Sequence, residues 1–329
     1  MPLYRIIVKN AWLTTWRNKF LWPFGFLASF WGIGSTYEVV LRSLDLSTER
    51  ELYWVRLWHD IISTGLNWES IKELFANGPL QVVLLLFFII LFGLVILFCF
   101  WLFTCSEIAV IKASSALLRK REIGNLFFES KEDFWPVFTV NLIGKVLIFL
   151  FLLLLSYPIL QPLLGTEYSI PVLMVYILFY VVIVAVVLII SFVTIISDIH
   201  IVVNKDSVMS AIKKSWAMVV NNWLVCLETA ILLFVISILV GFGLVLLTIL
   251  LSIPYLMLFY LASVVIGSIV IYWLLLILAL LTGLLVIFIV ISLVTTFQLV
   301  LWVELFEKIN NKSAVAKLER LGNVVLPTK

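Results

Sequence analysis

Residues 229–303 read TAILLFVISILVGFGLVLLTILLSIPYLMLFYLASVVIGSIVIYWLLLILALLTGLLVIFIVISLVTTFQLVLWV, a run of about 75 residues without Asp, Glu, Lys or Arg. A helix needs about 20 apolar residues to cross the roughly 30 Å hydrocarbon core of a bilayer. Uncharged runs of sufficient length also occupy residues 80–105, 146–166 and 168–197. These runs predict an integral membrane protein.

The composition indicates the same class of protein. The chain has 329 residues, of which 64% are hydrophobic and 12% charged, whereas soluble domains average about 45–50% apolar and about 25% charged residues. Lipid offers no partner for backbone N–H and C=O groups, and the alternation typical of barrel strands is absent. We therefore predict an all-α fold, a polytopic membrane helical bundle with about six transmembrane helices in one domain.

Charge and proline positions give approximate bounds for the spans. The chain would begin with an interfacial amphipathic helix over 1–20, carry an outer loop over 43–78 and end in a cytoplasmic tail over 307–329. The first four spans are expected at about 21–41, 79–107, 136–158 and 172–197, and a fifth would begin near Trp223.

The long run from Thr229 to Val303 has two interpretations. Three spans would place the basic tail outside, against the positive-inside rule, so two spans are favoured. Glycine and proline lower helix propensity, which predicts a break in the fifth span between Gly241 and Pro254. Broken backbone at membrane depth survives only inside a bundle, so Gly243 would pack there.

Lysine and arginine counts predict the orientation. The N-terminal segment, the segments 112–131 and 205–214 and the tail are rich in these residues, whereas the loop at Glu167 has none. Because the basic segments alternate with the others, both termini are expected in the cytoplasm, in a multi-pass protein of the cytoplasmic (plasma) membrane.

Three segments share one plan, a basic amphipathic helix with an aromatic residue, followed by the entry to a span. Trp12 aligns with Trp216, and Asn18 with Asn222, without a gap. The middle segment, near residues 127–135, matches more loosely. The plan fits either an internal repeat or three similar interfacial anchors. It predicts contact with inner-leaflet lipid by Lys9, Trp12, Lys213, Lys214 and Trp216.

The stretch 198–203 (DIHIVV), followed by Ser207 to Ala211 and by residues 213–216 (KKSW), resembles a pattern in a six-span prokaryotic family. That family is named for the membrane domain of glycerophosphoryl diester phosphodiesterases. The resemblance extends from the second span to the C-terminus and implies six spans. This chain has Asn204-Lys205-Asp206 where the family often has a glutamate. No catalytic residue can be transferred, because the chain has no room for the phosphodiesterase domain.

Ionisable residues inside a membrane are functional candidates. Lys145 in the third span and Glu228 in the fifth are both near the cytoplasmic side, so they form a candidate intramembrane pair; the alternative is that each reaches the interface. Asp198 and His200 point about 200° apart on a helix, which argues against a shared site and favours a solvated helix end.

The sequence provides little material for catalysis. It has two histidines and lacks P-loop, nucleophile-elbow, zinc and dinucleotide motifs, so we expect no enzyme activity, cofactor or metal. The leading hypothesis is a scaffold, accessory or lipid-interacting protein; the second is a transporter or permease-like component, and the third a membrane-embedded enzyme. Membrane lipids and other membrane proteins are the expected partners, while a net charge of +3 argues against nucleic acid.

Overall fold

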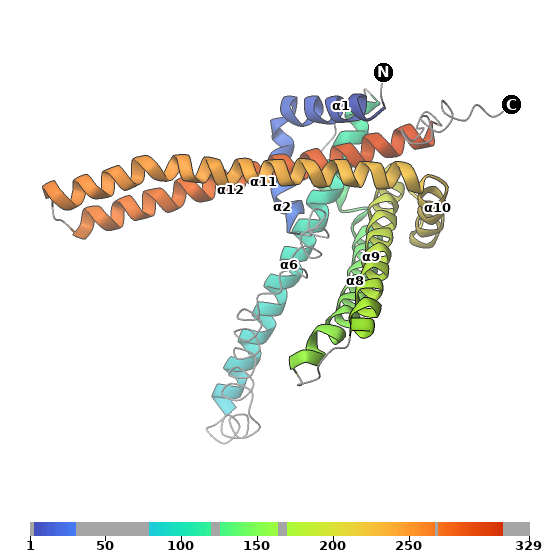
Figure 1. The fold of residues 1–329 in the computed structure, drawn as a ribbon, viewed down its shortest axis with the longest axis horizontal. Coiled ribbons are helices and arrows are strands. Elements are labelled where there is room, and N and C mark those ends of the chain that lie inside the picture. The colour runs from blue at the N-terminus through green and yellow to red at the C-terminus, as the bar shows by residue number, and fades with distance from the viewer. Residues whose placement is uncertain (1–2, 31–78, 120–125, 164–169, 267–268, 312–329) are drawn as a thin grey trace. The chain divides into compact units, whose positions relative to one another are not determined.

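The computed structural model describes residues 3–30, 79–119, 126–163, 170–266 and 269–311. These residues are almost entirely helical, and no strand forms among them, which confirms the predicted all-α fold (Figure 1). The helices are α1 (Leu3–Arg17), η1 (Lys19–Leu21), α2 (Trp22–Ser29), α6 (Pro79–Leu118), α7 (Leu126–Ser130), α8 (Phe134–Leu163), α9 (Ile170–Asn204), α10 (Val208–Asn221), α11 (Trp223–Leu261), the π-helix η2 (Ala262–Ile266) and α12 (Ile269–Asn310).

Five of the described helices are long and apolar enough to cross a membrane. The chain is therefore a multi-pass membrane protein. The expected first span, 21–41, begins with α2, but beyond Phe30 it lies outside the described residues, so the count of six stays a prediction. The candidate spanning segments are Leu86–Leu118, Phe134–Leu154, Met174–Asn204, Trp223–Val264 and Ile269–Asn310.

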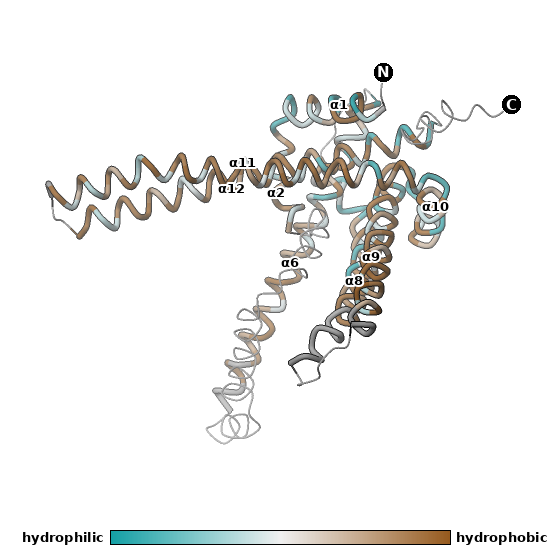
Figure 2. Tube along the Cα trace, in the orientation of Figure 1, coloured by the Kyte–Doolittle hydropathy of each residue, from teal (hydrophilic) through white to brown (hydrophobic). Residues whose placement is uncertain are grey.

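The buried core occupies the C-terminal parts of three long helices. Every residue of 104–111 in α6, 195–202 in α9 and 295–306 in α12 is buried. The opposite parts of these helices carry exposed apolar side chains, as at 86–92 and 269–270. With 42 residues, α12 is about 63 Å long at 1.5 Å per residue, roughly twice the hydrocarbon core. Each helix therefore combines a lipid-compatible part with a protein-packed end; Figure 2 shows how strongly apolar α11 and α12 are.

The run 229–303 forms two helices, so the two-span interpretation is correct, but the predicted break is wrong. α11 continues through Gly241, Gly243 and Pro254 to Leu261. A break would free several backbone groups where lipid cannot pair them. A continuous helix loses about 1 kcal/mol at each glycine and one hydrogen bond at the proline. The smaller cost explains the unbroken helix.

Two polar contacts join α11 to α12. Thr282 donates from Oγ1 to the Tyr255 hydroxyl at 2.8 Å, and Gln298 donates from Nε2 to Ser237 Oγ at 3.2 Å. These side chains lie 27 and 61 positions apart in the sequence. They fix the pairing of the two antiparallel helices at two separate levels, because polar side chains in an apolar setting seek partners across the helix interface.

Close packing depends on two glycines that the sequence did not single out. A β-carbon on Gly144 of α8 would lie 2.4 Å from Thr194 Oγ1 of α9, and one on Gly25 of α2 would lie 2.0 Å from Thr296 Oγ1 of α12. Around Gly243, by contrast, a β-carbon would meet nothing within 4 Å. The expectation that Gly243 packs inside the bundle is therefore wrong.

Helices α1 and α10 bury the same face in the same register. The spacing that aligns Trp12 with Trp216 also aligns their buried residues, and both tryptophans lie on the exposed side of their helix. α1 packs on α12 and α10 packs on α9. Matching burial is what an internal repeat predicts, and three similar interfacial anchors stay the alternative. The buried positions are Ile7, Ala11 and Thr15 in α1 and Ala211, Ser215 and Val219 in α10.

Candidate functional site

Three long helices bring two carboxylates and one amide together inside the protein. Glu107 of α6 is 0%, Asn141 of α8 is 4% and Asp198 of α9 is 1% exposed. The Asn141 amide donates from Nδ2 to Asp198 Oδ2 at 2.9 Å and to Glu107 Oε2 at 3.4 Å. One nitrogen thus holds two carboxylates that come from different helices. We call these three residues the inner polar cluster.

Lys145, one turn beyond Asn141 on α8, is partly buried. It interacts electrostatically with both Glu107 and Asp198. The sequence analysis also selected Lys145 but expected Glu228 as its partner. The structure assigns it two other acidic neighbours, and the pair with Glu228 on α11 stays a prediction.

Asp198 and His200 do not lie at a solvated helix end, as expected, because α9 continues to Asn204 and both side chains are buried. They do have separate partners, as their spacing predicts. Asp198 contacts Asn141, whereas His200 Nδ1 lies 3.3 Å from Asp206 Oδ2. The His200 ring also meets the ring of Phe306 edge-on, with centroids 4.8 Å apart. α12 therefore covers the end of α9 that the sequence suggested was open to water.

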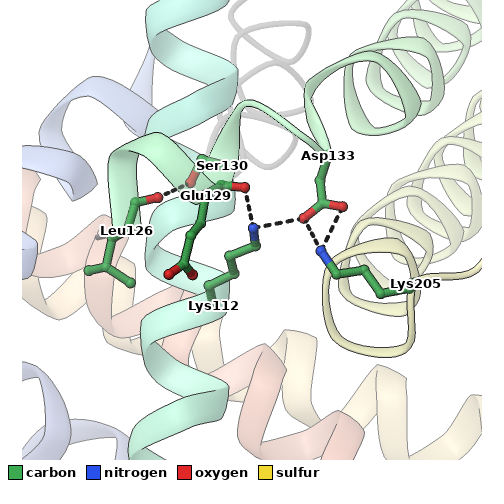
Figure 3. A network of polar contacts seen from close by, with 6 residues as sticks. All are labelled: Lys112, Leu126, Glu129, Ser130, Asp133 and Lys205. Carbon is green, nitrogen blue, oxygen red and sulfur yellow. Dashed lines mark hydrogen bonds and ion pairs between the residues drawn. The ribbon is translucent and has the colours of Figure 1, made fainter. Parts of the chain in front are cut away.

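A second polar group, which we call the outer ion-pair layer, consists of Lys112, Asp133 and Lys205 (Figure 3). Lys205 Nζ lies 2.9 and 2.6 Å from the two carboxylate oxygens of Asp133, and Lys112 Nζ lies 2.9 Å from Asp133 Oδ2. Lys112 also donates to the backbone carbonyl of Glu129. Lys205 has a φ of 58°, and its N–H donates to the carbonyl of Ile201. This left-handed residue ends α9 and turns the lysine toward Asp133.

The inner polar cluster and the outer ion-pair layer both connect α6, α8 and α9, but with the charges reversed. In the inner polar cluster an amide from α8 joins carboxylates of α6 and α9. In the outer ion-pair layer Asp133, which directly precedes α8, joins ammonium groups from α6 and from the end of α9. Lys112 follows Glu107 by five positions, so the layers are about 7.5 Å apart along α6 at 1.5 Å per residue. Polar contacts therefore fix the relative rotation of these helices at two levels.

The residues predicted to contact lipid lie on the exposed faces of α1 and α10. Trp12 is 45% and Trp216 is 55% exposed. Lys9 and Lys213 each precede their tryptophan by three positions and are also exposed. Lys214 differs, because its ammonium lies 2.5 Å from Asp206 Oδ1. The predicted set thus contains four side chains directed outward and one lysine already held by the protein.

Sequence reasoning missed Glu107 and Asn141. Glu107 was taken as the end of the second span, and Asn141 was not singled out, although it falls within the expected third span. Each is a polar residue within an apolar helix, a signal that marks a functional candidate. Their partnership was invisible, because the contacts of Asn141 join residues 34 and 57 positions apart.

Comparison with known proteins gives no relative: no family model, no curated protein and no solved structure matches this chain. The resemblance to the six-span family therefore stays a prediction.

Proposed function

We propose that this chain is a non-enzymatic integral membrane protein that contacts the anionic headgroups of one leaflet through α1 and α10. The observation that carries the proposal is the equivalence of the two helices. Both helices present a lysine and, three positions later, an exposed tryptophan. The residues at equivalent positions on the opposite face of each helix are buried.

The chemistry of these faces suits a membrane surface. On α10 the exposed residues Met209, Lys213, Trp216 and Val220 follow a helical spacing, so that apolar side chains and one ammonium group share a face. Tryptophan favours the region between headgroups and hydrocarbon, and lysine near an anionic surface contributes about 1 kcal/mol. Two such helices anchored to the ends of α9 and α12 would hold the bundle at a defined depth.

The experiment compares lipid retention by variants in nanodiscs that contain zwitterionic and anionic phospholipids. Native mass spectrometry of the released protein counts the anionic lipids that remain bound. We expect Lys9→Gln with Lys213→Gln to lose a substantial part of this retention. The matched control is Lys214→Gln, because Asp206 already holds that ammonium; it should retain the wild-type amount. Equal retention by the double variant and wild type would refute the proposal.

A second candidate function is that of a transporter or permease-like component. The observation in its favour is the inner polar cluster, because transporters of charged solutes place ionisable groups within the helix bundle. Flux of ions into proteoliposomes tests this candidate. Transport that disappears in Glu107→Gln but persists in Glu129→Gln, an exposed residue outside the cluster, would favour it over a purely lipid-contacting role.

A further inference from the structure

We propose that the inner polar cluster of Glu107, Asn141 and Asp198 binds one monovalent cation, and that Lys145 limits the number of bound cations to one. This inference concerns a ligand site and is independent of lipid contact by α1 and α10.

A count of formal charges within the cluster indicates the class of ligand. With both carboxylates ionised beside the Lys145 ammonium, this buried cluster would hold one net negative charge. An unbalanced buried charge costs several kcal/mol even after the protein relaxes. One monovalent cation cancels this charge, whereas a divalent ion would replace it with an equal positive excess. The charge count therefore selects the class of ligand.

The second observation is that ligand atoms remain free. Asn141 Nδ2 bonds to Glu107 Oε2 and Asp198 Oδ2, and the other oxygen of each carboxylate is buried without a hydrogen-bond partner among the described residues. Buried polar atoms in native proteins are almost always paired. The two carboxylates themselves lie close together, because their other oxygens accept hydrogen bonds from the same nitrogen. Carboxylate oxygens are also the preferred ligands of hard cations.

The shared chemistry of the ligand is a single positive charge held between two carboxyl groups. A proton and an alkali-metal ion both supply it. The charged or titratable groups around the site are Glu107 from α6, Lys145 from α8 and Asp198 from α9. In the outer ion-pair layer Asp133 pairs with Lys112 and with Lys205, and the Lys205 side chain is 55% exposed, so water solvates the excess positive charge there. His200 also lies on α9, but its partner is Asp206.

The test measures the thermal unfolding of the full chain in nanodiscs. One arm varies NaCl and KCl against choline chloride at constant ionic strength and pH. The other varies pH in choline chloride alone. A ligand that binds only the native state raises Tm in a saturable way. We expect a rise of several degrees either with Na⁺ or K⁺, which identifies an alkali ion, or with falling pH alone, which identifies a proton.

Variants determine whether the response comes from this cluster. Asp198→Asn removes one negative charge and leaves Glu107 balanced by Lys145, so the response should disappear. Asp133→Asn removes a carboxylate from the outer ion-pair layer, and the response should persist. If Asp198→Asn fails to fold, Lys145→Gln provides the opposite test, because an added negative charge should steepen the response. A wild-type Tm that changes in neither arm, or a response unchanged in Asp198→Asn or Lys145→Gln, would overturn the proposal.

Discussion

Asn18 and Asn222 donate their side-chain amides in the same way, each to the backbone carbonyl four residues earlier. The distances are 2.7 Å to the Thr14 carbonyl and 3.0 Å to the Met218 carbonyl. The backbone N–H of each asparagine bonds to the same carbonyl. Each asparagine therefore gives a carbonyl in the last turn of its helix two hydrogen bonds, one from the backbone and one from the side chain. Equivalent residues thus end α1 and α10 and lead into the helices that follow.

Because the two asparagines make the same hydrogen bond, their replacement should lower the stability of the protein by similar amounts. Asn18→Ala and Asn222→Ala should each destabilise the protein by about 0.5–1.5 kcal/mol, the usual net value of one hydrogen bond. Thermal unfolding in detergent measures the change. The control is Asn221→Ala, an exposed neighbour on α10, which should have little effect. If Asn222→Ala and Asn221→Ala behaved alike, the hydrogen bond would have no role in ending α10.

Close packing between α8 and α9 makes Gly144 sensitive to size. Gly144→Ala places a methyl group against Thr194 Oγ1 and should cost about 1–3 kcal/mol, as overpacking usually does. Thr194→Ala removes the conflicting atoms, so the double variant should recover part of this loss. Gly243→Ala should be neutral or slightly stabilising, because its surroundings are open and alanine favours helix. Equal losses at Gly144 and Gly243 would contradict this packing.

The outer ion-pair layer predicts that replacing Asp133 destabilises the fold more than replacing Lys205 does. Asp133→Asn deprives two lysines of their carboxylate and should destabilise the fold by about 1–3 kcal/mol. Lys205→Asn should cost less than about 1 kcal/mol, because its side chain is 55% exposed and asparagine tolerates a positive φ. Unfolding of both variants at one salt concentration measures the difference. A larger loss at Lys205 than at Asp133 would be inconsistent with this account.

The orientation is testable by single-cysteine labelling in intact cells. Replacement of Cys99, Cys105 and Cys226 provides the background. Cysteines at positions 9, 131 and 213 should resist an impermeant reagent, whereas those at 51 and 167 should react, because the basic segments are expected in the cytoplasm. Labelling at 317 would imply an odd number of spans and reject the six-span topology.

The sequence predicted the elements well and their contacts poorly. Uncharged runs located the long helices, and the starts at Pro79 and Trp223 agree with α6 and α11. Pro254 was misleading, because a proline lowers the stability of a helix but lipid makes breaking it costlier. Asp198 was misleading as well, because helices distant in sequence cover it.

The inner polar cluster could not be predicted for a geometric reason. Its contacts depend on the rotation of α6, α8 and α9 about their own axes, and almost uniformly apolar helices carry no periodic pattern that reveals this rotation. In α1 and α10 a lysine and a tryptophan recur at fixed spacing, so their exposed faces were predictable. Sequence patterns therefore identified the candidate lipid-contacting surface but not the buried site.

The claim that α1 and α10 are equivalent interfacial helices is tested most directly by nitroxide labels at Trp12→Cys and Trp216→Cys. The protein is reconstituted in anionic vesicles, and power saturation compares collisions with oxygen and with a water-soluble nickel chelate. Glu132→Cys, at an exposed position, provides the aqueous reference. Equivalent helices predict that both labels lie at the same depth near the headgroups and collide more with oxygen than the reference does. Nickel collisions at positions 12 and 216 equal to those at position 132 would contradict the account.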